Sequence, residues 1–197
     1  MSSREKILEA ITTNKPPQTP LPEIIIDMLY EPPVLLEQFM FTLQAIGATV
    51  IKTENIQIIR DDLQKSLSNG ERIVNTIEEL GITGNDVTIT SDAFFLEPVE
   101  IAYIMGTLGV AENGAIWLEE SSMVNRLLPF ICQRLVIVLD AGKIVPNMHE
   151  AYKQITIDKE GYGVFLAGPS KTADIEQSLV IGAHGAKSLQ VYILNCQ

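Results

Sequence analysis

The chain has 197 residues, a formal net charge of −11 and an apolar fraction of 46%. This length and composition are those of a globular protein, so we expect one main domain with a short appendage. The acidic balance argues against proteins that grip nucleic acids or anionic membrane surfaces, because such binding depends on clustered lysine and arginine. No apolar run approaches the roughly 20 residues that a membrane-spanning helix requires.

Two further classes are disfavoured by the N-terminus and the cysteines. The N-terminus carries charges where a signal peptide would have its apolar core, so we expect a cytoplasmic protein. Cys132 and Cys196 lie far apart and belong to no CxxC motif. Together with only two histidines, they predict no zinc or iron–sulfur site within one chain. We therefore expect no metal or cofactor bound by this chain itself.

Residues 1–33 are expected to form a helix and a proline-rich arm ahead of an α/β domain at 34–197. Ser2 and Glu5 fit a capping box in front of a short helix. Six of the ten prolines lie between positions 16 and 33. Because prolines remove backbone donors, this stretch is predicted to lie outside regular helices and sheets.

From residue 34 onward, helical and strand patterns alternate. The spacing predicts helices over 34–47 and 55–70, with a buried strand over 48–53 between them. Further strands are expected over the ranges 72–75, 86–90, 99–105, 114–119, 134–140, 163–168 and 190–194, and further helices over the ranges 125–130 and 146–155.

This alternation predicts an α/β three-layer sandwich with a mainly parallel sheet. The apolar runs over 135–140 and 163–168 lack strict alternation, as expected for strands that are covered on both faces. Residues 99–119 differ, because two strand-like runs flank a turn in the manner of an antiparallel hairpin.

The sequence LGVAENGAIW, residues 108–117, places Glu112 at the tip of this turn. Asn113 and Gly114 tolerate positive φ and favour a type I′ turn, so one interpretation is a hairpin with an exposed acid. The alternative is that the turn projects Glu112 into a cleft, where the carboxylate acts as a base or a nucleophile. Residues 111–114 also resemble the Ser-Glu-Asn-Gly loop of family I CoA-transferases, in which the glutamate attacks an acyl thioester.

Residues 167–176, AGPSKTADIE, are expected to join a strand to a helix that begins near Thr172. In one interpretation, the loop binds a carboxylate or phosphate through the helix dipole, the hydroxyls of Ser170 and Thr172, and the charge of Lys171. In the other, Ser170 or Thr172 is an ordinary N-cap, and Asp174 complements the helix dipole. The loop does not match a Walker A motif, so nucleotide hydrolysis is not predicted.

Two more side chains are candidates for a site. His184 lies between glycines in a loop before the last strand, where it either titrates near neutrality and takes part in catalysis or bonds a carbonyl as a turn residue. Arg126 precedes Pro129, which is expected to end its helix, and either reaches an acid or anionic ligand or stays solvated. The catalytic candidates are thus Glu112 and His184, and the ligand-binding candidates are Asn113, Gly114, Arg126, Gly168, Pro169, Ser170, Lys171, Thr172 and Asp174.

In this order and spacing, the segments GVAENGAIWL, RLLPF, IVP, GPSKTADIE and GAHGAKSLQVYIL resemble the LUD-domain family of lactate-utilisation proteins. The resemblance extends from about Leu80 to the C-terminus. It implies a fold similar to that of sugar-phosphate isomerases and CoA-transferases. It also implies a cytosolic subunit that contributes to oxidising L-lactate to pyruvate beside iron–sulfur partner subunits and carries no cofactor of its own.

Four positions depart from the family pattern. The turn of the family usually reads Ala-Glu-Thr-Gly-Thr, whereas this chain has Asn113 and Ala115; arginine is more frequent where Lys171 stands, and proline where Ala186 stands. The substrate can therefore be another small carboxylate. Two other classes stay open: a stand-alone acyl-CoA or sugar-phosphate enzyme that uses Glu112, and a regulatory module that binds a small organic acid.

Overall fold

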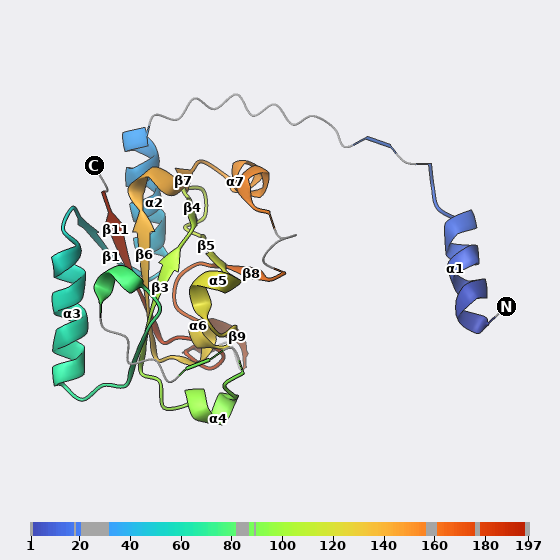
Figure 1. Cartoon of the computed structure of the whole chain (residues 1–197). Helices are drawn as coiled ribbons and strands as arrows, with labels where there is room; N and C mark the ends of the chain where they lie inside the picture. The colour runs from blue at the N-terminus through green and yellow to red at the C-terminus, as the bar shows by residue number, and fades with distance from the viewer. Residues whose placement is uncertain are drawn as a thin grey trace.

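A five-stranded parallel sheet runs through the centre of the molecule (Figure 1). The structure is a computed structural model, and it describes residues 2–17, 19–20, 32–81, 87–88, 90–156, 161–175 and 178–195. The strands lie in the order β1-β11-β6-β3-β2, and each neighbouring pair is parallel. Their bounds are β1 Thr49–Thr53, β2 Ile73–Asn75, β3 Ile101–Gly106, β6 Arg134–Asp140 and β11 Ser188–Leu194. The predicted α/β fold with a mainly parallel sheet is confirmed.

One face of the sheet is covered by α3 (Ile56–Ser68), as its sequence pattern predicted. Ile59 and Leu63 are fully buried and pack in one cluster with Tyr103 and other side chains of the sheet. Burying each such side chain contributes roughly 1.5–3 kcal/mol relative to leaving it in water. The Asn55 side chain caps the helix by accepting a hydrogen bond of 2.8 Å from the backbone N–H of Gln57.

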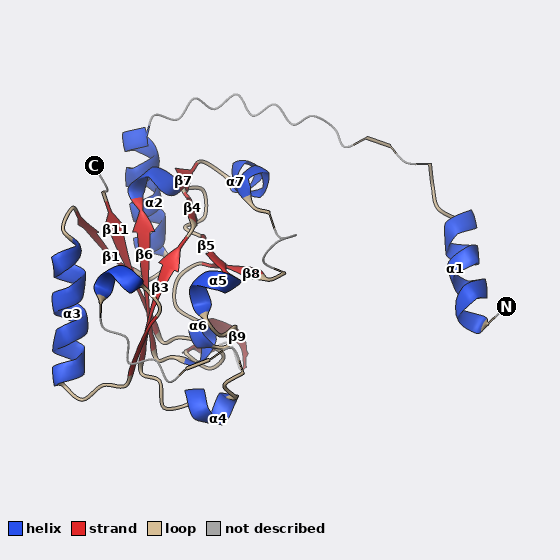
Figure 2. Cartoon of the chain, in the orientation of Figure 1, coloured by secondary structure: helices blue, strands red, loops and turns tan. Residues whose placement is uncertain are grey.

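The opposite face is covered by α2 (Pro32–Ala45), whose buried side chains recur every four residues at Leu35, Phe39 and Leu43. Because successive residues of a strand point to opposite faces, β3 contributes Ala102 and Ile104 to the hydrophobic cluster under α2. Its neighbouring residues Ile101 and Tyr103 belong to the cluster under α3. Figure 2 shows the sheet between its helical layers.

A second sheet of four short strands joins the α2 side in the order β7-β4-β5-β8. The strands are β4 (Leu108–Val110), β5 (Ile116–Glu119), β7 (Ile144–Val145) and β8 (Gly163–Leu166). Strands β4 and β5 form the predicted antiparallel hairpin. The prediction that residues 163–168 are covered on both faces is wrong: β8 pairs antiparallel with β5, and its four residues are partly exposed. An uninterrupted apolar run in the sequence therefore does not distinguish a strand at the edge of a sheet from a strand at its centre.

The remaining described helices are short: α1 (Ser3–Thr13), η1 (Glu78–Leu80), α4 (Ala93–Leu96), α5 (Glu120–Met123), α6 (Leu128–Ile131), η2 (Ala141–Lys143) and α7 (Met148–Gln154). The predicted capping box of α1 is confirmed, with both Ser2–Glu5 hydrogen bonds present. Pro129 lies in the first turn of α6, so the prediction that it ends the helix is wrong; its missing N–H costs nothing at that position. None of the helices in the described ranges is long and apolar enough to cross a bilayer.

The predicted helix after Thr172 is wrong. Lys171–Ile175 and Ser178–Ile181 are instead the strands β9 and β10, which pair antiparallel. Backbone hydrogen bonds at Ser170 fix this geometry, because its N–H donates to Ala186 and its carbonyl accepts from Gly182. The β-branched residues of this stretch also favour strands.

The predicted strand over 86–90 is not found either. Val87, Thr88 and Thr90 belong to no strand, and residues 86 and 89 lie outside the described part of the chain. The Thr88 carbonyl instead accepts a hydrogen bond from the side chain of Asn125. A hydrogen bond from a side chain therefore takes the place of the strand pairing that the polar–apolar alternation predicted.

Candidate functional site

The segment Gly168–Lys171 lines a cavity of about 490 Å³, here called the Lys171 cavity. It lies near the amino-terminal ends of β6 and β11, which contribute Leu135 and Leu189 to its wall. The wall is mostly apolar, and its other hydrophobic side chains are Ile46, Pro129, Phe130, Phe165, Leu166, Ala167 and Ala186. The polar side chains that line it are Ser170, Lys171 and His184.

The backbone of this segment is set by its contact with the end of α2. Gly168 has φ +72°, and a Cβ there would lie 3.0 Å from the carbonyl oxygen of Ile46. Any other residue at this position would therefore have an unfavourable backbone conformation, and its Cβ would lie too close to this oxygen. The anion-binding interpretation loses its helix dipole, because β9 rather than a helix follows the segment. Ser170 and Lys171 keep their places in the cavity without it.

Lys171 has a structural contact of its own. Its Nζ donates a hydrogen bond to the carbonyl oxygen of Ile46, which follows the last turn of α2. This bond satisfies one of the carbonyls that a helix end leaves without an intrahelical donor and places a positive charge at the negative end of the helix dipole. An ammonium group carries three N–H donors, so two remain for a ligand.

His184 joins Lys171 in the same cavity. The imidazole is exposed, and its loop is fastened to Ser170 by two backbone hydrogen bonds of 2.9 Å and 3.0 Å, through Ala186 and Gly182. The structure therefore brings together candidates that lie more than ten positions apart in the sequence. A hydroxyl, an ammonium and an imidazole can together bind one carboxylate and exchange a proton.

Glu112 does not line this cavity. It is exposed, and its carboxylate accepts a hydrogen bond of 3.1 Å from the backbone N–H of Met148, the first residue of α7. Its own N–H donates to the carbonyl of Pro146 at 3.0 Å. These bonds fasten the turn to the segment before α7, as an exposed structural acid would.

The predicted type I′ geometry of this turn is wrong, because Gly114 has φ +70° and Asn113 does not have positive φ. Asn113 instead accepts a hydrogen bond of 3.0 Å from Ala115 N–H through its side chain. A Cβ at Gly114 would lie 3.2 Å from Ile46 Cδ1, so this turn packs on the same residue that contacts Gly168. Ile46 thus lies between the two candidate loops.

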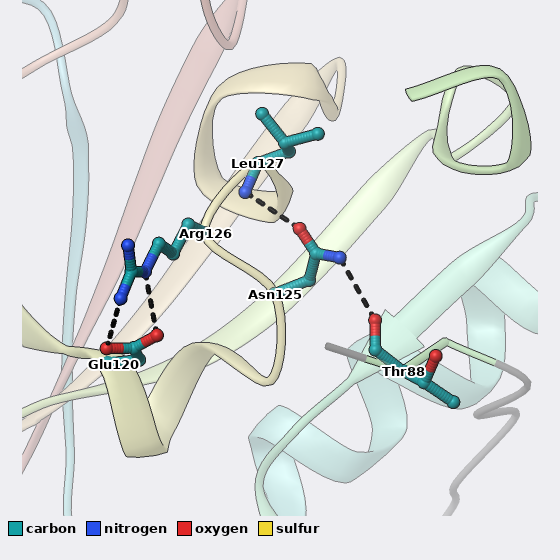
Figure 3. A network of polar contacts seen from close by, with 5 residues as sticks. All are labelled: Thr88, Glu120, Asn125, Arg126 and Leu127. Atoms are coloured by element: carbon teal, nitrogen blue, oxygen red, sulfur yellow. Dashed lines mark hydrogen bonds and ion pairs between the residues drawn. The ribbon is translucent and has the colours of Figure 1, made fainter. Parts of the chain in front are cut away.

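Arg126 pairs with an acid of the protein. Its Nε and Nη2 donate to the two carboxylate oxygens of Glu120 at 2.7 Å and 2.9 Å (Figure 3), and its guanidinium stacks over the ring of Tyr162 at 4.8 Å. The hydrogen bond from Arg126 lowers the pKa of Glu120. Arg126 does not line the Lys171 cavity. Thr172 and Asp174 lie on β9, and the side chain of Asp174 is outside the described part.

The LUD domain family model matches residues 101–194, which supply every residue of the Lys171 cavity except Ile46. Residues 101–194 of this chain are similar to the LUD domain family. The predicted family resemblance is thus confirmed over that region. The edge strands β1 and β2 and the helices α2 and α3 lie outside the matched residues, yet they complete the sheet and its two covered faces.

Curated relatives align with about half of this chain. Lactate utilization protein C of Oceanobacillus iheyensis is 26% identical over 106 residues, which are 50% of this chain and 45% of that protein. Lactate utilization protein C of Bacillus pumilus is 30% identical over 95 residues, which are 45% of this chain and 40% of that protein. An uncharacterized protein of Neisseria meningitidis is 30% identical over 100 residues, which are 49% of this chain and 43% of that protein. The aligned part thus spans less than half of each relative.

A solved structure has a fold similar to that of most of this chain. The crystal structure of a DUF162 family protein from Deinococcus radiodurans matches with a TM-score of 0.61 over 84% of this chain and 99% of that chain. The two sequences are 17% identical, so this likeness concerns the fold alone.

Most of the wall of the Lys171 cavity could not be predicted from the sequence. Phe130, Leu135 and Leu189 are apolar residues of helix or strand patterns, which indicate core packing rather than a site. Ile46 lies more than a hundred positions from Lys171 in the sequence. Its place at the end of a predicted helix was the one feature of the sequence that marked it, and this feature does not indicate a site. The described part of the chain contains no group of three or more His, Cys, Asp or Glu residues that could hold a metal ion.

Proposed function

We propose that this chain serves lactate utilisation as a subunit that binds a small carboxylate, L-lactate, in the Lys171 cavity. The observation that carries the proposal is the alignment of about half of this chain with proteins named Lactate utilization protein C. The aligned part is less than half of those relatives, and the residues of the Lys171 cavity give independent support for the substrate.

The chemistry of the cavity supports a ligand with one negative charge and a small apolar part. Lys171 keeps two donors and Ser170 a hydroxyl for a carboxylate. The apolar wall suits the methyl group of lactate, whose burial is favourable. In this proposal, His184 takes the proton of the substrate hydroxyl as a base.

Oxidation of lactate to pyruvate releases two electrons and two protons. We assign the electrons to iron–sulfur partner subunits, which the family resemblance implies, and a binding and proton-transfer role to this chain. His184 takes the hydroxyl proton, and the proton of the broken Cα–H bond leaves to solvent as its electron pair passes to the partner subunits. Glu112 receives no part in this reaction, because its carboxylate is bonded to the start of α7 and does not line the cavity. A stand-alone acyl-transfer enzyme would instead require that carboxylate as its nucleophile.

The test is to purify the tagged chain from its native host grown on lactate, identify the proteins that accompany it, and assay lactate-dependent dye reduction. Ser170→Ala and His184→Gln are expected to lower the rate at least tenfold, a loss of about 1.4 kcal/mol in transition-state stabilisation. His149→Gln is the matched control, because His149 is exposed on α7 and does not line the cavity.

Co-purification of iron–sulfur proteins, with activity that depends on Ser170 and His184, would support the proposal. A chain that is recovered alone, shows no lactate binding in titration calorimetry, and loses nothing on His184→Gln would contradict it. Glu112→Gln separates the acyl-transfer alternative, because only that mechanism loses its nucleophile.

A further inference from the structure

A second cavity, of about 610 Å³, lies at the carboxyl ends of the parallel strands and is here called the carboxyl-edge cavity. Its lining residues end or follow strands of the central sheet: Glu54 follows β1, Ile77 follows β2, Met105 lies near the end of β3 and Asn195 follows β11. The Lys171 cavity lies at the opposite, amino-terminal edge. In open parallel α/β sheets, ligands bind in the crevice outside the carboxyl ends of the strands.

The inner surface of this cavity is apolar. Met105, Val138 and Leu194 come from three neighbouring strands and belong to the hydrophobic cluster under α3. Ile77 and Leu80 of the segment around η1 add buried side chains to it. A volume of this size is typical of pockets for small organic molecules, whose apolar parts such a surface would remove from water.

The charged side chains among the described lining residues are both acidic. Glu54 and Glu79 line the cavity, both are exposed, and neither carboxylate has a hydrogen bond or ion pair with a described residue. Arg60, on α3, directs two donors to the backbone carbonyl of Glu79 rather than to its carboxylate. The amide of Asn195 is the remaining polar side chain of the lining.

We propose that the carboxyl-edge cavity binds a small organic cation, an ammonium group on an apolar body. The apolar part would lie on Met105, Val138 and Leu194, and the ammonium would pair with the carboxylates of Glu54 and Glu79. An anion is disfavoured at this rim because both carboxylates repel it. This ligand class is opposite in charge to that proposed for the Lys171 cavity, so the two cavities serve different molecules.

The test is a titration of the purified full-length chain with 2-phenylethylammonium, followed by calorimetry and by amide chemical shifts of the lining residues. The anion 3-phenylpropanoate, of similar size, is titrated in parallel. We expect saturable binding of the cation, shifts confined to the ends of β1, β3, β6 and β11 and to the segment around η1, and much weaker binding of the anion.

Three variants make the test specific. Glu54→Gln and Glu79→Gln should each weaken binding of the cation by roughly threefold, the effect expected for an exposed ion pair. Glu78→Gln removes the same charge from the neighbouring exposed position, which does not line the cavity, and should leave binding unchanged. Equal binding of the anion, no saturable binding at millimolar concentrations, or equal weakening by Glu78→Gln would each overturn the proposal.

Discussion

At the scale of single residues, Lys171 combines a candidate ligand contact with a structural one. Its ammonium is bonded to the Ile46 carbonyl at the end of α2, so removing it affects the helix whether or not a ligand is present. We expect Lys171→Met to lower the free energy of unfolding by about 1 kcal/mol, from the lost hydrogen bond and dipole interaction. Urea denaturation of the ligand-free chain measures this.

Lys143→Met is the control for that substitution, because Lys143 is exposed and has no hydrogen bond or ion pair with a described residue. It should change the free energy of unfolding by no more than about 0.5 kcal/mol. If both variants unfold at the same urea concentration as the parent chain, the bond to Ile46 contributes nothing to stability.

The raised pKa of Tyr192 allows a prediction of how the stability of the folded chain changes at alkaline pH. Burial, followed by the charge of Asp62, raises the pKa of Tyr192 from 10.0 to about 12. Between these values the unfolded chain has lost a proton that the folded chain retains, so stability falls as pH rises, by about 1.4 kcal/mol per pH unit for one proton. Burial also raises the pKa of Tyr103, which donates a hydrogen bond of 2.9 Å to Asp62.

Two tyrosines therefore contribute to the same alkaline window, and Tyr192→Phe should remove roughly half of the loss of stability with pH. Urea denaturation at several pH values above the ordinary pKa of tyrosine measures how steeply the free energy of unfolding falls with pH. Tyr152→Phe is the control, because Tyr152 is 62% exposed. An unchanged slope in Tyr192→Phe would contradict the assignment of the raised pKa.

At the scale of elements, the turn between α5 and α6 stores strain at Val124. Val124 has φ +62° and ψ −44°, and Asn125 N–H donates to the Met123 carbonyl at 2.7 Å across it, which makes a γ-turn of the strained kind. The turn is held by Asn125, whose side chain donates to Thr88 and accepts from Leu127 (Figure 3).

We expect Val124→Gly to stabilise the chain by about 1 kcal/mol, because glycine takes positive φ without the clash of a Cβ. Val124→Ala keeps a Cβ and should recover only part of this gain. Thermal unfolding with both variants measures the difference. A loss of stability in Val124→Gly would show that the valine side chain contributes more by packing than the backbone loses by strain.

The elements of the two main layers could be predicted because two signals agreed there. In α2 and α3, apolar residues recur every three or four positions, and in β6 they run without a break between polar residues. In residues 171–181 two signals disagreed: the start resembled a helix N-cap, whereas the β-branched residues favour strands. Their pairing into β9 and β10 is set by backbone contacts with residues near 186, which no local pattern records.

At the scale of the whole molecule, only part of the candidate site could be predicted. The polar members Ser170, Lys171 and His184 were identifiable by their chemistry. Their convergence depends on strand order and on the loop hydrogen bonds at Ser170, which connect residues far apart in sequence. Arg126 and Glu112 carried the same kind of signal, yet they are engaged by Glu120 and by the start of α7.

The N-terminal helix α1 tests the division of the chain at residue 33, which stays a prediction. α1 has no buried residue, so it adds almost no burial of apolar surface to the stability of the domain. Deleting residues 2–14 should therefore change the free energy of unfolding by less than about 0.5 kcal/mol. Deleting residues 2–45 removes α2 with its buried Phe39 and Leu43 and should prevent stable folding. Urea denaturation followed by circular dichroism compares the two truncations with the full chain, and a substantial loss of stability in the shorter deletion would show that α1 belongs to the folded domain.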